Sequence, residues 1–423
     1  MRVEQALRML PEAEGLAPLR ALLLSSARAP DDDWGSGAPY RTIGRCEASP
    51  ETMLQNVAEA SARVQAHLGE LWERYISALE HVDHNDSAAA TAALLANGRQ
   101  EQESGRLVQA RAWFQSARTL AEGLKDRKPE VETQLALGEL ALFLGFYEDA
   151  AREFQRALVL AEFDFDQTSA IRAAKGLGDV AVERAAWTGA NAWYSRALRL
   201  AEAMPHERWV AQLHHAVAEL ARRMGDLNAA SVSVRAARER FESLGDSHEM
   251  ARVLTTQGLI EGQHGLHARA SAALSEALAL VRSGAPDLGL EVFIRIQIAR
   301  VHVEQRRYLE AEEELRRAED LAIAANLLRR LAEIYSLLGT ARGEQGDETA
   351  FVFFEQALEI ARMLDRWPIA EAQVLYDYGR FRERLGAADE AFAHFERARE
   401  IFESVGASAE LERVRFDLRR ISA

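Results

Sequence analysis

The chain has 423 residues, 48% of them apolar and only 7% aromatic, and it carries a formal net charge of -15. An acidic balance of this size repels nucleic acid and anionic membranes, so neither is expected as a partner. The single cysteine, Cys46, excludes a disulfide framework and a cysteine-based zinc site. The chain shows no apolar signal core and no run near the ~18 apolar residues of a membrane span, which predicts a cytoplasmic protein without membrane insertion.

Residues 1–85 are predicted to form a helical N-terminal region with a loop at 30–50. Leucines in residues 1–29 supply apolar faces, and their exposed apolar content makes a homodimer possible. Residues 30–50 concentrate proline, glycine, serine and aspartate, which is typical of loops. From about 51 to 82, apolar residues recur with a helical period and predict one long helix.

Residues 86–405 contain an internal repeat of two helices. An alanine that opens each second helix recurs in steps of 40, 40, 40, 40, 41, 39 and 41 residues. A bulky apolar residue follows four positions later and another alanine three positions after that, so all three share one helical face. The alanines allow close approach of a second helix, and the large residue fills the remaining gap. The opening alanines are Ala110, Ala150, Ala190, Ala230, Ala270, Ala311, Ala350 and Ala391.

A small residue also recurs twelve positions before each opening alanine, inside the first helix. It is glycine in most units and alanine at Ala218 and Ala299, and Gly339 joins the set if its turn is one residue short. Glycine within a helix costs roughly 0.5–1 kcal/mol relative to alanine, so its repeated use predicts that a side chain would collide with the paired helix. Glycines between the two helices, such as Gly145 and Gly225, suit a left-handed cap.

This pattern resembles the tetratricopeptide repeat family, on the strength of Gly138, Ala150, Phe154, Ala157 and their equivalents. The resemblance implies an all-α fold: a right-handed superhelix of about eight helix-turn-helix repeats. The period of 40 exceeds the usual ~34, and the closing proline is missing. The longer period looks like the subgroup of kinesin light chain, LGN-type adaptors and MalT-type regulators. Residues 406–423 are predicted to form a capping helix, with apolar residues on one face only.

The resemblance also implies that the first helices line a concave groove that holds a protein or peptide partner. Arginine is suited to gripping a carboxylate, so a partner with an acidic segment is one interpretation. The alternative is a solvated face with salt bridges between adjacent helices. The positions projected into the groove are Arg172, Lys175, Asp179, Glu183, His215, Glu219, Arg222, Arg223, Arg252, Arg300, Glu304, Tyr376, Arg380 and Glu383.

Catalytic, metal and cofactor motifs are not recognisable in the sequence. His81 with Asp83 and His84, the pair His264 and His267, and the pair His214–His215 lack a full ligand set, so surface histidines are the better interpretation. Cys46 has no general base nearby in sequence, and no Gly-rich phosphate loop occurs. We therefore expect no cofactor and no enzymatic activity.

Two non-enzymatic functions follow from this layout. The first is an interaction scaffold or adaptor that binds its partner in the concave groove. The second is a bacterial regulator gated by a peptide or ligand, because an N-terminal helical region before such repeats looks like the layout of the Rap family. A bacterial source is consistent with basic residues that are nearly all arginine, the lysines being only Lys125, Lys128 and Lys175.

Overall fold

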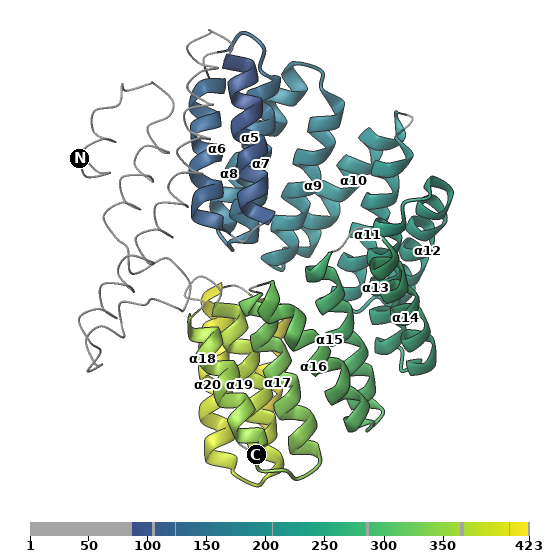
Figure 1. The fold of residues 1–423 in the computed structure, drawn as a ribbon, viewed down its shortest axis with the longest axis vertical. Coiled ribbons are helices and arrows are strands. Elements are labelled where there is room, and N and C mark those ends of the chain that lie inside the picture. Colours follow the sequence, from purple (N-terminus) through teal and green to yellow (C-terminus); the bar gives the residue numbers. More distant parts are fainter. Residues whose placement is uncertain are drawn as a thin grey trace, which may run out of the picture. The chain divides into compact units, whose positions relative to one another are not determined.

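The computed structural model describes residues 87–103, 106–122, 124–204, 206–284, 287–325, 327–363, 368–405 and 407–421. Within these ranges the chain forms 17 helices and no strand (Figure 1). It divides into two compact units, residues 1–140 with 152–169 and residues 141–151 with 170–423, and each is considered by itself. The predictions for residues 1–85, for Cys46 and for His81, Asp83 and His84 lie outside the described residues.

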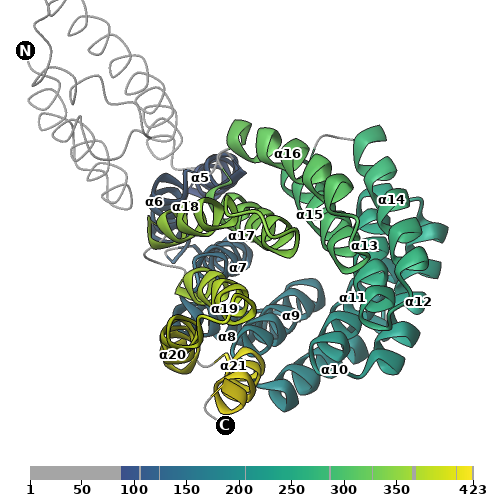
Figure 2. The ribbon, with the colours of Figure 1, turned by 90° about the horizontal axis from the view of Figure 1, so that it is seen from below.

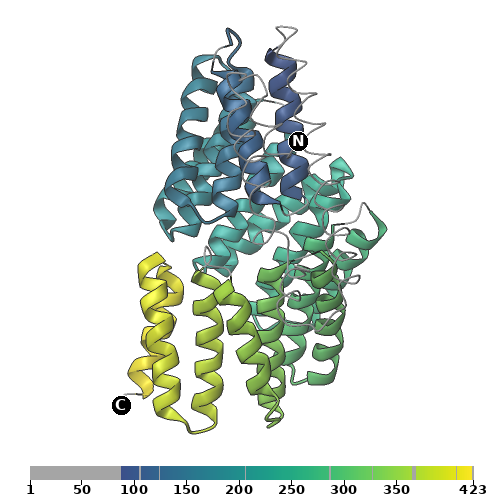
Figure 3. The same cartoon turned by 60° about the vertical axis from the view of Figure 1, so that its left-hand side comes forward.

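Eight helix pairs follow one another, as the repeat pattern predicts. The first helices are α5 (Ser87–Glu103), α7 (Lys128–Phe143), α9 (Gln167–Glu183), α11 (Glu207–Arg223), α13 (Ser247–Gln263), α15 (Leu288–Glu304), α17 (Leu328–Glu344) and α19 (Pro368–Arg384). The second helices are α6 (Leu107–Ala121), α8 (Tyr147–Phe163), α10 (Trp187–Glu202), α12 (Leu227–Leu244), α14 (His267–Ser283), α16 (Tyr308–Ala324), α18 (Ala350–Met363) and α20 (Ala388–Val405). A last helix, α21 (Ser408–Ile421), ends the array, and Figure 3 shows the green to yellow C-terminal helices side by side.

The repeated alanines form the centre of each helix pair. All eight opening alanines, and the alanines seven positions after them, are 0% exposed. The bulky residue between them is buried in every repeat, from Phe114 to Phe395. A core of this kind brings the two helices close together and fills the space with one large side chain, which confirms the predicted packing.

The first-helix glycines lie directly against those large residues. A Cβ added at Gly98, Gly138, Gly178, Gly258, Gly339 or Gly379 would come within 3.0 Å of the large side chain of the paired second helix. Gly339 faces Phe354, which confirms that its turn is one residue short. Where alanine replaces the glycine, the facing residue is the aliphatic Val234 or Leu315 rather than an aromatic ring. In the eight described pairs aromatic rings thus occur only opposite glycine, whereas aliphatic residues face alanine or, at Leu274, glycine.

The turns within the helix pairs use a left-handed residue, as expected for Gly225, Gly265, Gly346 and Gly386. The same conformation occurs at Ala185 and Arg306, with φ of 53° and 60°, at the equivalent turns. The sequence did not reveal these two caps because neither residue is glycine. Several helices also begin with an aspartate cap, for example Asp246, whose carboxylate accepts from the Glu249 N–H at 3.1 Å.

Phe165 offers a test of backbone strain in the turn between α8 and α9. Its φ is 58° and its side chain is 89% exposed, whereas Gly245 occupies the equivalent turn after α12. We expect Phe165→Gly to raise the free energy of unfolding by about 0.5–1 kcal/mol. The left-handed conformation costs an L-residue roughly 1–2 kcal/mol, and glycine avoids this cost. Part of the gain is lost because the unfolded chain is more flexible at glycine. Phe165→Ala is the control: it keeps the strain and should change stability little. Urea unfolding followed by circular dichroism compares the two variants.

Helix α21 packs as the predicted cap. Val414 and Leu418 are buried against the cluster formed by α19 and α20, and Leu411 and Ile421 are partly buried there. The opposite side of α21 is solvated and mostly charged, with Phe416 exposed among the charged residues. This apolar-in, charged-out division is what the end of a repeat array requires.

Candidate functional site: the first-helix face

The first helices of the second unit form one continuous row. Each packs on its own second helix and on the preceding second helix, and α11, α13, α15, α17 and α19 also pack on one another in succession. Figure 2 shows α11, α13 and α15 on the inner side of this row, with α12, α14 and α16 outside them. We call the exposed side of the first helices, together with α21, the first-helix face. It is the concave side of the row and carries most of the residues predicted for the groove.

Polar side chains connect neighbouring first helices across this face. His215 on α11 is hydrogen-bonded to the Thr256 hydroxyl on α13 at 2.9 Å. The Ser336 hydroxyl donates to Asp377 at 3.1 Å, and the Tyr376 hydroxyl donates to Asp417 on α21 at 2.8 Å. In all three contacts the partners are 41 residues apart, so the repeat places them at equivalent heights on adjacent helices.

Most of the predicted basic residues are paired with acids. The Lys175 ammonium lies 2.8 Å from Asp179, which also accepts from the Tyr194 hydroxyl at 2.7 Å. The Arg222 Nε donates to Glu219 at 2.9 Å. Arg223 contacts Glu183 of the preceding first helix at 3.0 Å and Glu219 at 3.2 Å.

Further along the row the same pairing continues. Arg300 on α15 reaches Glu333 on α17 at 2.9 Å, while Arg252 is 53% exposed and lies 3.8 Å from Glu249. Arg172 on α9 is half-buried. The face is therefore mixed in charge and largely neutralised, rather than basic. Interhelical salt bridges, the alternative interpretation, account for part of this pattern, and the binding role of these residues stays a prediction.

Glu333 is the centre of a charged cluster that sequence reasoning missed. It accepts from the guanidinium groups of Arg300 and Arg330, at 2.9 Å each. Burial raises the pKa of this carboxyl, but the two arginines outweigh burial and lower the pKa to about 2. Glu333 holds the repeat position of Arg172 and Arg252, six residues before the first-helix glycine, so the spacing could have identified it.

Three further groups on the face have shifted pKa values. Burial, assisted by Arg252, lowers the pKa of His215 to about 4, so its imidazole is neutral at pH 7. Burial raises the pKa of Asp377, and Arg300 offsets this only in part. Burial and the hydrogen bond to Asp417 raise the pKa of Tyr376 to about 12. In all three groups the largest cause of the pKa shift is withdrawal from water.

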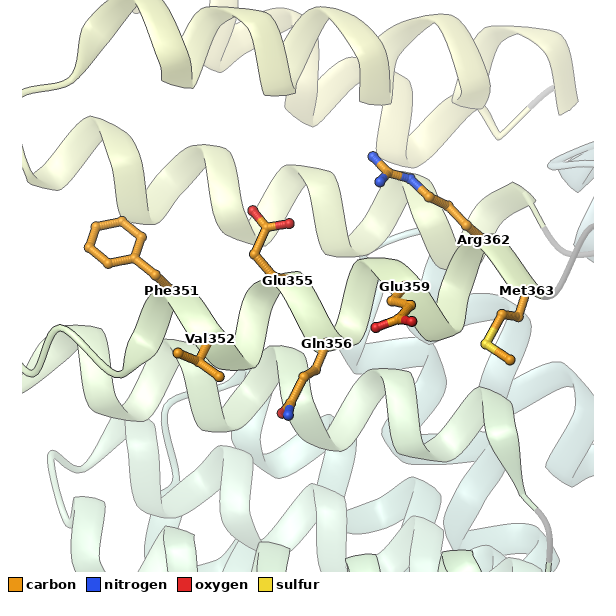
Figure 4. Close-up of a pocket in the computed structure, with 7 residues that line it drawn as sticks. All are labelled: Phe351, Val352, Glu355, Gln356, Glu359, Arg362 and Met363. Atoms are coloured by element: carbon orange, nitrogen blue, oxygen red, sulfur yellow. The ribbon is translucent and has the colours of Figure 1, made fainter. Parts of the chain in front are cut away.

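The surface of the second unit has depressions, two of which bear on the site. The larger, about 710 Å³, is lined by Phe351, Val352, Glu355, Gln356, Glu359, Arg362 and Met363. Figure 4 shows that all seven side chains come from the single helix α18, so no groups from other described helices converge there. The smaller, about 420 Å³, lies between α19 and α21 and includes the predicted groove residues Tyr376 and Arg380.

The histidine pairs show no metal-binding arrangement. His267 contacts Glu304 at 3.3 Å, and His214 is half-buried with a pKa lowered by burial. Across the described ranges, no group of three or more His, Cys, Asp or Glu side chains could hold a metal ion. In the same ranges, no helix has both the length and the apolar character to cross a membrane.

Comparisons with known proteins agree with this architecture. A family model for the tetratricopeptide repeat matches residues 330–404. No curated protein matches the chain in sequence. A Rap protein crystallised with competence and sporulation factor shares 12% identity and a TM-score of 0.54, over 78% of this chain and 97% of its own. NprR in complex with its cognate peptide NprX shares 12% identity and a TM-score of 0.50, over 77% and 97%.

A third similar structure extends over nearly the whole chain. It is a signal transduction ATPase with numerous domains, with a tetratricopeptide repeat sensor, from Pyrococcus horikoshii. It shares 13% identity and a TM-score of 0.50, over 99% of this chain and 64% of its own. At these identities the likeness concerns the fold. The matched family model assigns tetratricopeptide repeats to residues 330–404, and the other described helix pairs share the same packing of a small residue against a large one.

Proposed function

We propose that the chain is a non-enzymatic interaction protein that binds a peptide or protein segment along its first-helix face. The observation that carries this proposal is the row of polar and charged side chains on consecutive first helices. Arg223, Arg252 and Arg300 are 37%, 53% and 40% exposed and remain accessible to a partner. The hydrogen-bonded pairs His215–Thr256, Ser336–Asp377 and Tyr376–Asp417 lie at equivalent heights on successive helices, which suits an extended ligand that crosses several repeats.

The electrostatics of the face define the kind of partner. Because most charges are already paired, a partner must exchange or extend existing ion pairs rather than neutralise a basic surface. Arg252 lies 3.8 Å from its acidic neighbour, beyond hydrogen-bond distance, and is the predicted groove residue of repeats three to five best placed to accept a carboxylate. A segment with a few acidic side chains fits this surface.

Charge reversal at Arg252 tests the proposal. A tagged full-length chain is used to capture its partner from the native cell, and the affinity of the identified partner is then measured with purified proteins. We expect Arg252→Glu to weaken binding about tenfold or more, because one favourable charge contact becomes repulsive. Arg269→Glu is the matched control: Arg269 is exposed on the second helix of the same repeat. A partner that resists Arg252→Glu and is lost with Arg269→Glu would place the interface on the outer helices.

A peptide-gated regulator is the second candidate. It is favoured by the fold likeness, which covers 97% of both the Rap protein crystallised with competence and sporulation factor and NprR with NprX. The helical region predicted for residues 1–85 would be the effector part. Small-angle scattering of the full chain with a bound peptide distinguishes the two functions: compaction supports gating, and an unchanged radius of gyration supports a passive scaffold.

A further inference from the structure

The depression between α19 and α21 differs from the rest of the first-helix face. We call it the C-terminal pocket; it is lined by Tyr376, Arg380, Glu412, Arg413, Phe416, Asp417 and Arg420. Helix α21 begins at Ser408, 40 residues after Pro368 begins α19, so it stands where the first helix of a ninth repeat would stand. The bond from Tyr376 to Asp417 repeats the bond from Ser336 to Asp377 one repeat earlier. The cap therefore also extends the binding face.

The acids of the pocket are already engaged. Asp417 accepts from Tyr376 at 2.8 Å and lies 2.8 Å from Arg420, which also contacts Glu383 at 2.7 Å. Glu412 contacts Arg415, outside the pocket, at 3.3 Å. These pairs engage Arg420 and both acids of the lining, Glu412 and Asp417, so neither of these two carboxylates forms an ion pair with Arg380 or Arg413.

Arg380 and Arg413 are the cations that remain. Arg380 is exposed and makes no ion pair with any residue that the structure describes. Arg413 is 56% exposed and has only a contact of 3.4 Å to Glu410, one turn earlier on its own helix. The two side chains approach the pocket from different helices. Planar guanidinium groups so placed can hold one carboxylate between them with charge-assisted hydrogen bonds.

An apolar wall lies beside these cations. Phe416 is 67% exposed although it belongs to the pocket lining. It holds the repeat position of Tyr376, 40 residues earlier, which α21 covers. In the described part of the chain no further helix covers Phe416. An exposed ring next to two arginines fits an acidic residue with an apolar neighbour, since the ring can bury the apolar side chain while the carboxylate remains at the guanidinium groups.

We propose that the C-terminal pocket binds an aspartate or glutamate side chain of a peptide partner, together with the apolar residue next to it. This inference rests on the proposed function and specifies where that partner is anchored. Arg380 and Arg413 hold the carboxylate, and Phe416 contacts the apolar side chain. Charge complementarity identifies the occupant, because the pocket's own acids are bound to other partners.

The test uses a synthetic library of C-terminally amidated decapeptides, in which Asp, Glu, Asn or Gln at a central position is followed by varied residues. The full chain captures peptides from solution, and mass spectrometry identifies them. We expect captured peptides to favour Asp and Glu over their amides and to carry an apolar residue next. Arg380→Gln and Arg413→Gln should each weaken the best peptide about tenfold or more, because each removes a charged donor. Phe416→Ala should remove the apolar preference.

Arg419→Gln is the matched control. Arg419 is exposed on α21, lies outside the pocket and makes no ion pair with any described residue. The affinity of the Arg419→Gln variant for the best peptide should therefore stay within about twofold of the wild-type affinity. If the peptides bind Arg380→Gln, Arg413→Gln and wild type equally well, the proposed binding role of the C-terminal pocket is wrong. Weaker binding to Arg252→Glu would in that case still support binding along the first-helix face. If nothing is captured, the pocket is contradicted, and the Arg252 experiment decides the proposed function separately.

Discussion

Gly379→Ala is expected to lower the free energy of unfolding by about 1–3 kcal/mol, the usual cost of overpacking a core. An added Cβ would lie 2.8 Å from the Phe395 ring and 3.3 Å from the Ala391 carbonyl oxygen, both on the paired helix α20. Helix propensity alone would favour alanine by about 0.5–1 kcal/mol. The sign of the change therefore shows whether packing or propensity governs this position. Urea unfolding of the full chain, followed by circular dichroism, measures it.

A second substitution identifies the cause. Phe395→Leu in the Gly379→Ala background recreates the pair found at Ala299 and Leu315, so the double variant should lose less stability than the two single variants together. Gly262→Ala is the control, because its Cβ would meet no atom closer than 3.9 Å, and it should be neutral or stabilising. If Gly379→Ala proves as harmless as Gly262→Ala, the close approach of the helices does not explain the repeated glycines.

Glu333→Gln is expected to lower the free energy of unfolding at pH 7 by about 2–3 kcal/mol. The folded-state pKa of Glu333, about 2, lies below its ordinary value of 4.5. The carboxylate therefore stabilises the fold above pH 4.5, and this contribution is lost as the pH falls from about 5 towards 2. Wild type should lose stability over that window, and the glutamine variant should lose less. Urea midpoints at pH 7, 4.5 and 3 provide the comparison.

Asp377→Asn is the matched control on the next first helix. The pKa of Asp377 is raised, so ionisation of this carboxyl at pH 7 opposes folding, and the opposition ends as the pH falls through the raised pKa. The asparagine variant should be no less stable than wild type at pH 7, with its advantage shrinking in acid. An equal loss of stability in the glutamate and aspartate variants at every pH would contradict the assigned pKa directions.

The fold was predictable because its cause is local and repeated. A buried alanine face and a glycine opposite a large side chain leave a visible pattern at a period of 40 residues. Once the helices of one repeat are assigned, the same spacing assigns the helices of the other repeats. The pairing of charges was not predictable in the same way. Arg172, Arg252 and Glu333 share one repeat position, and which acid meets which base depends on side chains of neighbouring helices. The sequence supplies the residues on the face but not their contacts.

Two other structural features were not predicted from the sequence, for related reasons. The left-handed turns at Ala185 and Arg306 are imposed by the geometry of the repeat, although neither residue prefers that conformation. Helix α21 was predicted only as a cap because its apolar stripe accounts for packing alone. Its charged side joins the first-helix face through the hydrogen bond from Tyr376 to Asp417, which depends on how α19 and α21 are aligned.

Among the described residues α21 occupies the place of a first helix and has no second helix after it, so the repeat unit of 40 residues can be counted from any point along the array. Duplication of a 40-residue segment within the gene would insert a whole unit and preserve every glycine-to-ring contact on either side. Lengthening of the array in evolution would thus require no change to the existing units.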